Sequence, residues 1–181
     1  MRQNLSKTEK VFFSSYIKKF NKDGGQIKRI LMFTQDNIYF MSPMLGKFKI
    51  NRKIAISDVN GVTDSQDTAN PEIVLHIKNS YDERLNCGQS RKHIVAVLRL
   101  VLAAAQVNDF HHYQVPLKKL KPYVTLKSDV KKDRVRRPNE DYEINWSVND
   151  NIEQIAKTIF DPTGEVTSIL SLQHPLPTNI D

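Results

Sequence analysis

Five basic side chains surround one glycine-rich turn near the start of the chain. The stretch Ile17 to Thr34 reads IKKFNKDGGQIKRILMFT, and it holds two runs of β-forming residues joined by Gly24-Gly25. The basic residues in and beside this turn are Lys18, Lys19, Lys22, Lys28 and Arg29. Ammonium and guanidinium groups at the rim of a stiff hairpin can bind phosphate oxygens. The stretch therefore predicts a polyanion site, for either a lipid headgroup or a nucleic acid.

The charge distribution supports an anionic partner. The chain has 181 residues and a net charge of +7. Residues 1–60 carry 12 lysines and arginines against 4 acidic residues, and residues 118–137 carry 9 against 2. Residues 138–181 carry 1 basic residue against 8 acidic ones, so an acidic tail follows the two basic blocks. Each block is either a solvated surface or, where two share a face, an anion-binding footprint.

A second group of cations lies in the strand-like run Lys47 to Ile56. These residues either widen the hairpin patch or form the solvated side of a half-buried strand. The predicted lipid-binding residues are Lys18, Lys19, Lys22, Lys28, Arg29, Arg52 and Lys53. The hypothesis requires that the head groups of Lys19 and Arg29 lie on one side of the molecule, clear of neighbouring carboxylates.

The sequence shows no pattern typical of an enzyme. His111-His112 lacks partners at metal-ligand spacing and is predicted to lie in a surface loop, while His76 is predicted to be structural. Cys87 is expected to be a small apolar strand residue, and no Gly-Lys-Ser/Thr follows Gly24-Gly25. We expect no catalytic residues, no metal and no cofactor. No apolar run approaches the ~20 residues of a membrane span. Met1 to Lys10 has no hydrophobic signal region and the lone Cys87 fits a reducing compartment, so we expect a cytoplasmic protein that is peripheral on the membrane.

Strand patterning precedes one long helix. Apolar alternation predicts strands at Val11 to Asn21, Ile27 to Thr34, Ile38 to Met41, Lys47 to Ile56, Val59 to Thr63, Glu72 to Lys78 and Tyr81 to Cys87. Arg91 to Gln106 follows with a helical apolar stripe and Ser90 at its start. We predict a mainly β fold with α, a barrel of about seven antiparallel strands capped by a C-terminal helix.

Residues 1–107 are expected to form this barrel and its helix. Residues 108–181 then make a proline-punctuated extension with short strands and one helix, packed on the barrel. Val115 to Lys127 is a basic strand-like run, and an apolar stripe predicts the helix near residues 150–159.

The order of these motifs resembles the tail-homology domain of class I myosins, a pleckstrin-homology-like module, over residues 11–107. The resemblance lies in Lys19-Phe20-Asn21-Lys22 with Lys28-Arg29-Ile30-Leu31-Met32-Phe33-Thr34, in Arg52-Lys53-Ile54 leading to Gly61-Val62-Thr63, and in Ile73-Val74-Leu75-His76-Ile77. It implies phosphoinositide binding through Lys19 and Arg29. Where the family has a further basic residue this chain has Ile27, and Lys28 is basic instead. Lys28 and Arg29 point to opposite faces of a strand, so either could face the barrel mouth.

Two functions from different classes follow. The first is a peripheral membrane-targeting module that binds anionic phospholipids or phosphoinositides through the first hairpin. The alternative is a protein-interaction or cytoskeletal scaffold module with the same fold. Nucleic acid is the weaker third reading, because the basic runs at residues 118–121 and 131–137 have no aromatic stacking motif, zinc pattern or recognition helix beside them.

Overall fold

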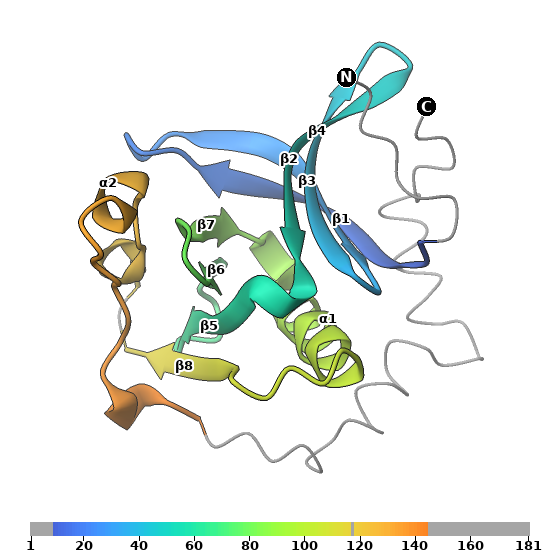
Figure 1. The fold of residues 1–181 in the computed structure, drawn as a ribbon. Helices are drawn as coiled ribbons and strands as arrows, with labels where there is room; N and C mark the ends of the chain where they lie inside the picture. Colours follow the sequence, from blue (N-terminus) through green and yellow to red (C-terminus); the bar gives the residue numbers. More distant parts are fainter. Residues whose placement is uncertain (1–8, 117, 145–181) are drawn as a thin grey trace.

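The computed structural model describes residues 9–116 and 118–144, and strands dominate this part of the chain (Figure 1). The strands are β1 (Val11–Phe20), β2 (Gln26–Thr34), β3 (Asn37–Met44), β4 (Lys47–Ala55), β5 (Val59–Ser65), β6 (Glu72–Ile77), β7 (Glu83–Asn86) and β8 (His111–Val115). The helices are α1 (Arg91–Ala104) and the one-turn α2 (Lys127–Val130), with short 3-10 turns between elements.

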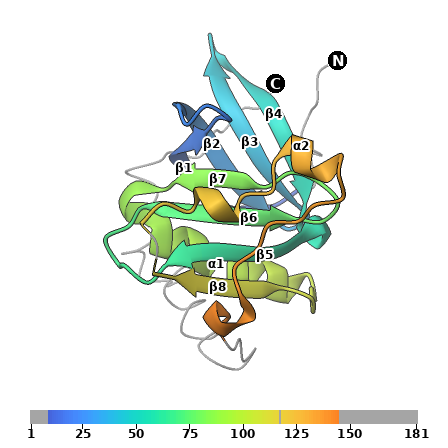
Figure 2. The same ribbon diagram turned by 90° about the vertical axis from the view of Figure 1, so that its left-hand side faces the viewer.

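All eight strands belong to one sheet in the order β4-β3-β2-β1-β7-β6-β5-β8. Neighbours run antiparallel except β5 and β8, which are parallel. Only two residue pairs, Lys18 with Asn86 and Lys19 with Leu85, join β1 to β7, and the sheet bends at this short junction (Figure 2). Within the described residues the edge strands β4 and β8 are not paired, so the sheet is not closed. The predicted mainly β fold with one long helix is confirmed.

The main core fills the concave side of the sheet, here called the inner face. Leu31 and Phe33 of β2 point into it, and α1 adds Leu98 and Leu102, all fully buried. The predicted helix is thus confirmed, although it ends at Ala104, just before the left-handed backbone of Gln106 at φ 55°. In Figure 1 the strands β5, β6 and β7 lie between α2 and α1.

Strand β3 continues through Pro43 to Met44, beyond Met41, where the sequence-predicted strand ended. Its pairing with β2 ends at Met41, whereas its pairing with β4 runs on to Met44. Beyond Met41 one side of β3 has no partner strand, so the N–H that proline lacks is not needed there.

The described residues after α1, 108–116 and 118–144, extend the sheet and pack on it. Strand β8 forms its edge, and Leu120 and Val124 pack against Val74 on the outer, convex face. The predicted strand over residues 115–127 is wrong, because β8 ends at Val115 and turns and α2 follow. A domain boundary at residue 107 stays a prediction, and the predicted helix near residues 150–159 lies outside the described residues.

Candidate anion-binding site

The turn between β1 and β2 is closed by its own backbone. The Asn21 amide donates to the Gly25 carbonyl oxygen at 2.8 Å, and the Gly24 amide donates to the Asn21 carbonyl oxygen at 3.1 Å. Gly24 has a φ of +85°, which residues with side chains rarely adopt. A Cβ atom on Gly25 would lie 2.9 Å from Asn21 Nδ2. The backbone of the turn therefore favours glycine at position 24, whereas a side chain at position 25 would require the Asn21 side chain to shift. The turn sets which residues of β1 and β2 face each other.

This register puts Lys19 and Arg29 on the same face. Ile17 pairs with Arg29 and Lys19 pairs with Ile27. Paired residues share a face, as do residues two apart on one strand, and Ile17 is part of the inner core. Lys19 and Arg29 therefore both extend from the inner face in the half of the hairpin nearest the turn, and Lys28 extends from the outer face.

The hypothesis required Lys19 to be clear of carboxylates, but Lys19 forms an ion pair with Glu83. Its Nζ lies 2.9 Å from Glu83 Oε1, and Arg52 Nη1 lies 2.7 Å from the same oxygen. The Glu83 side chain is 2% exposed and the Arg52 side chain 11%, whereas that of Lys19 keeps 28%. One carboxylate thus balances two cations, and this group of three side chains keeps a net positive charge.

A third cation, Lys127, lies close to the ring of Tyr81. Arg52 stacks on this ring with its guanidinium carbon 3.7 Å from the ring centroid, and Lys127 Nζ of α2 lies 4.7 Å from the same centroid. Lys19 Nζ lies 6.0 Å away. Arg52 also donates to the carbonyl oxygen of Tyr81 at 2.9 Å and to Ser80 Oγ at 3.1 Å. We call Lys19, Arg52, Lys127 and Tyr81 the Tyr81 cluster.

The outer face of the same hairpin carries a separate pair of cations. Lys18 and Lys28 lie directly opposite each other in the register, and Lys28 Nζ lies 4.5 Å from the centroid of the Tyr16 ring. Like charges in direct opposition destabilise a strand pair. Lys22 is exposed in the turn itself. The hairpin therefore presents lysines on its outer face and at its tip as well as on its inner face.

Lys53 is not brought to this hairpin. It pairs with Tyr39 on the outer face, and its Nζ lies 5.7 Å from the centroid of the Tyr39 ring. Tyr39 in turn pairs with Met32, near the turn between β2 and β3 at the opposite end of the sheet from Gly24. The structure thus places Lys53 away from the first hairpin and on the opposite face of the sheet from its neighbour Arg52.

Sequence reasoning missed three members of this neighbourhood: Glu83, Tyr81 and Lys127. A signal existed for Glu83, since it alternates with Leu85 and Cys87 in a run whose other members are apolar. A carboxylate on a core-facing position needs a cationic partner. Nothing in the sequence indicates that Lys127 reaches Tyr81, because that contact depends on how residues 118–130 cross the sheet.

The second basic block is partly neutralised within the fold. Arg136 Nε lies 2.8 Å from Asp129 Oδ2, and Arg137 Nη1 lies 2.9 Å from Asp82 Oδ2. The block retains exposed cations at Lys118, Lys119, Lys121, Lys131, Lys132 and Arg134. These two arginines therefore act as internal ion-pair partners rather than as surface cations.

The histidines serve the fold. His76 is fully buried between Thr63 Oγ1 at 2.6 Å and Asp82 Oδ2 at 2.9 Å, as a structural residue should be. The prediction that His111 and His112 form a surface loop is wrong, because both lie in β8 and His112 is buried against Asp64 at 3.0 Å. Parallel pairing with the distant β5 inserts that residue into the sheet.

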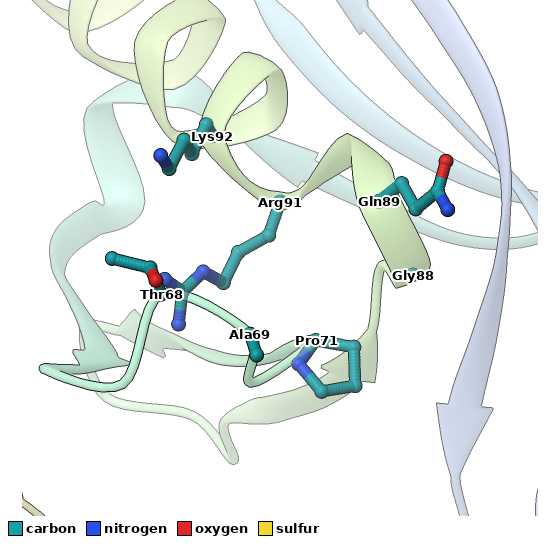
Figure 3. Close-up of a pocket in the computed structure, with 7 residues that line it drawn as sticks. All are labelled: Thr68, Ala69, Pro71, Gly88, Gln89, Arg91 and Lys92. Atoms are coloured by element: carbon teal, nitrogen blue, oxygen red, sulfur yellow. The ribbon is translucent and has the colours of Figure 1, made fainter.

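A separate pocket lies at the start of α1, beside the loop between β5 and β6 (Figure 3). Arg91 points across it toward Thr68 and donates to the carbonyl oxygens of Ser65 and Asp67 at 3.3 and 3.0 Å. Its buried guanidinium thus braces the loop. In the described part of the chain no cluster of His, Cys, Asp or Glu could hold a metal ion, and no helix there is long and apolar enough to cross a bilayer.

Comparison with known proteins identifies the family. The model of the unconventional myosin tail, a family described as actin- and lipid-binding, matches residues 1–148. The chain belongs to this family. The resemblance to a myosin tail domain inferred from the first hairpin and the strands after it is thereby confirmed. Comparison of this myosin tail domain with curated proteins finds no match.

Solved structures similar to this myosin tail domain share little sequence with it. The hSac2 domain of the human phosphoinositide phosphatase Sac2 is 11% identical, with a TM-score of 0.47 over 61% of this chain and 79% of that one. The linker-DH/PH structure of p115-RhoGEF is 9% identical, with a TM-score of 0.45 over 58% of this chain and 35% of that one. The Slm1 PH domain, solved with inositol-4-phosphate, is 12% identical, with a TM-score of 0.43 over 52% and 96%.

Proposed function

We propose that this myosin tail domain docks peripherally on membranes by binding anionic phospholipids, phosphoinositides in particular, at the inner face of its first hairpin. The binding residues are Lys19, Arg29, Arg52 and Lys127, which extend from β1, β2, β4 and α2. The observation that carries the proposal is the Tyr81 cluster. It holds three cations around one ring, and Glu83 is the only carboxylate paired with them among the described residues.

The charge balance of this face favours a multiply charged phosphate ligand. With Arg29 included, four cations stand against one carboxylate. Arg29 Nη1 donates to the Lys28 carbonyl oxygen at 2.9 Å, which leaves other N–H groups of its guanidinium for a ligand. Each lysine or arginine near an anionic leaflet contributes about 1 kcal/mol, so this face supplies about 3 kcal/mol net.

The lysines around the turn add a less specific contribution. Lys18 and Lys28 repel each other across the strand pair, and a nearby anionic surface relieves that repulsion. Lys22 lies between them in the turn. We assign these three residues to general attraction toward the leaflet and the inner-face cations to the headgroup. Lys53 is left out of this assignment because of its place near the opposite end of the sheet.

Quantitative vesicle sedimentation tests the proposal. Vesicles of phosphatidylcholine alone, with phosphatidylserine, and with a phosphoinositide are compared at low and high salt. Lys19→Ala and Arg29→Ala should each weaken binding to phosphoinositide vesicles by about fivefold or more, equivalent to about 1 kcal/mol. Lys53→Ala removes the same charge elsewhere and is the matched control. Equal sedimentation with neutral vesicles, or equal losses in all three variants, would refute the site.

A cytoskeletal protein partner is the second candidate, because the family is described as actin-binding as well as lipid-binding. The lipid site leaves unused the exposed cations Lys118, Lys119, Lys121, Lys131, Lys132 and Arg134. Co-sedimentation with filamentous actin is the test. The double variant Lys131→Glu with Lys132→Glu should reduce actin co-sedimentation, whereas Lys19→Ala should leave it unchanged. If Lys19→Ala reduces co-sedimentation and the double variant does not, this second surface is excluded.

A further inference from the structure

The hairpin between β3 and β4 ends in an exposed apolar tip. Met44 pairs with Lys47, so Leu45 and Gly46 alone make the turn. Leu45 is 103% exposed and Met44 is 59% exposed, and Leu45 is the most exposed large apolar side chain among the described residues. We call Met44, Leu45 and Gly46 the β3–β4 tip. In both views the β3–β4 hairpin projects beyond the rest of the sheet (Figures 1 and 2).

The turn itself does not require a leucine. Gly46 provides the left-handed backbone, with a φ of +65°, and a Cβ atom there would meet nothing within 4 Å. Two-residue hairpin turns favour asparagine, aspartate or glycine beside such a glycine, because these residues are polar and tolerate the backbone. At 103% exposure, Leu45 gains no burial from any of the described residues. The Leu45 side chain is therefore better suited to an apolar environment than to water.

Cations stand immediately behind the tip. Lys47 and Lys49 are exposed, and they alternate along β4 with the half-buried Phe48 and Ile50. At about 3.3 Å per strand residue, Lys49 lies roughly 10 Å behind the turn. An apolar end with lysines one to three residues behind it matches the polarity change across a lipid headgroup layer, where ammonium groups meet phosphates and apolar groups meet acyl chains.

The β3–β4 tip and the first hairpin lie at the same end of the sheet, although they point apart beyond the last β2–β3 pair, Ile30 with Met41 (Figure 1). Strand β3 runs antiparallel to β2, and β2 runs antiparallel to β1, so both turns lie at the same end of the sheet. Ile27, 42% exposed beside the first turn, adds a further apolar group at this end. A protein partner suits this feature less well, because the three-residue convex tip offers far less area than a stable protein interface of about 800 Å² per partner.

We propose that the β3–β4 tip inserts into the membrane interface, with Leu45 and Met44 entering the acyl-chain boundary while Lys47 and Lys49 contact lipid phosphates. This inference rests on the proposed lipid binding and adds to it an apolar, salt-insensitive anchor. Charge attraction is screened as ionic strength rises, whereas burial of Leu45 is not. The two hairpins thus contribute separable kinds of affinity.

Site-specific labelling tests insertion directly. A cysteine at Leu45 carries an environment-sensitive fluorophore, and Cys87 does not compete for the label because it is buried, which raises the pKa of its thiol. Vesicles of phosphatidylcholine and phosphatidylserine carry a nitroxide quencher on the acyl chain. The Leu45→Cys probe should be quenched and blue-shifted on binding. A probe at Val135→Cys, another exposed apolar position at 66%, is the matched control and should not respond.

Binding measurements separate this inference from the lipid-binding proposal. Leu45→Ser should weaken sedimentation with anionic vesicles by about tenfold at both low and high salt, since a buried leucine side chain is worth about that factor. Val135→Ser should change nothing. If the wild type binds but the Leu45 probe is no more quenched than the Val135 probe, or Leu45→Ser binds as well as wild type, insertion is overturned and the lipid site stands. A wild type that fails to bind overturns both.

Discussion

Replacing Glu83 by glutamine should strengthen membrane binding and weaken the fold. Glu83 accepts ion pairs from Lys19 at 2.9 Å and from Arg52 at 2.7 Å through the same oxygen. A lipid phosphate that enters the Tyr81 cluster must compete with this carboxylate for both head groups. Glutamine keeps the side-chain shape and removes the charge, so it removes the competitor while leaving Lys19 and Arg52 in place.

The expected magnitudes follow from burial and charge. Removing one negative charge at the leaflet adds about 1 kcal/mol of attraction, which is about a fivefold gain in vesicle affinity. Loss of one partner from a fully buried ion pair costs 3–5 kcal/mol of unfolding free energy, at order of magnitude. Because the Lys19 side chain keeps 28% exposure and water screens part of its charge, we expect a cost of about 2–3 kcal/mol here.

The assay pairs vesicle sedimentation with urea denaturation, and Glu72→Gln is the matched control. Glu72 accepts a bidentate ion pair from Arg84, with oxygen-to-nitrogen distances of 2.8 and 3.0 Å, and it is buried like Glu83. Arg84 follows Glu83 in β7 and so extends from the opposite face of the sheet. The control therefore makes the same change in net charge and a comparable change in stability away from the Tyr81 cluster.

Two results would refute this reasoning. Equal affinity gains in Glu83→Gln and Glu72→Gln would show that total charge, rather than the Tyr81 cluster, governs binding. A folded Glu83→Gln variant with reduced phosphoinositide binding would show that the carboxylate orients Lys19 and Arg52 for the ligand instead of competing with it.

Three further predictions concern the fold that supports the site. Gly61→Ala should cost about 1–3 kcal/mol in urea denaturation, because its Cβ would lie 2.8 Å from the His111 carbonyl oxygen of β8; stability equal to wild type would contradict this contact. Arg137→Ala should cost about 3 kcal/mol or more by the same assay, since it leaves the fully buried carboxylate of Asp82 without its cation; a neutral change would refute the ion pair. Burial lowers the pKa of His76 in the folded state against the opposing effect of Asp82, so the unfolded chain binds a proton that the fold excludes. Stability should then fall below about pH 6.5, by up to about 1.4 kcal/mol per pH unit, and His76→Gln should flatten the pH dependence measured by urea denaturation at pH 7 and 5.5.

The strands, the helix and the first turn could be predicted from local sequence alone. Alternation located the seven strands up to Cys87, and the helical stripe of Ile94 and Leu98 located α1, because side-chain periodicity follows directly from backbone geometry. Gly24-Gly25 located the first turn because a left-handed backbone favours glycine. These features depend on residues close together in the chain.

The predictions that failed or stayed open depend on contacts between residues far apart in the chain. His112 was predicted at the surface because nothing near it in sequence indicates that β8 pairs in parallel with β5. The face chosen by Arg29 stayed open at the sequence level because a shift of one residue in register reverses every side chain. Glu83 and Lys127 join Lys19 only after β7 and α2 are placed, so the balance of charge at the site could not be computed from the block totals.

The end of the sheet that carries the first turn departs from ordinary stability rules in two ways that the fold does not require. Lys18 faces Lys28 across a strand pair, where a neutral partner would be more stable, and Leu45 occupies a turn position where a polar residue would be better solvated. Both departures lie at one end of one sheet, and an anionic lipid surface would relieve both, the first through its charge and the second through its apolar interior. Departures from local stability rules tend to mark functional sites. A single anionic ligand in solution would relieve the lysine repulsion alone, so Leu45 is the residue that separates a membrane from a soluble phosphate as the partner of this surface.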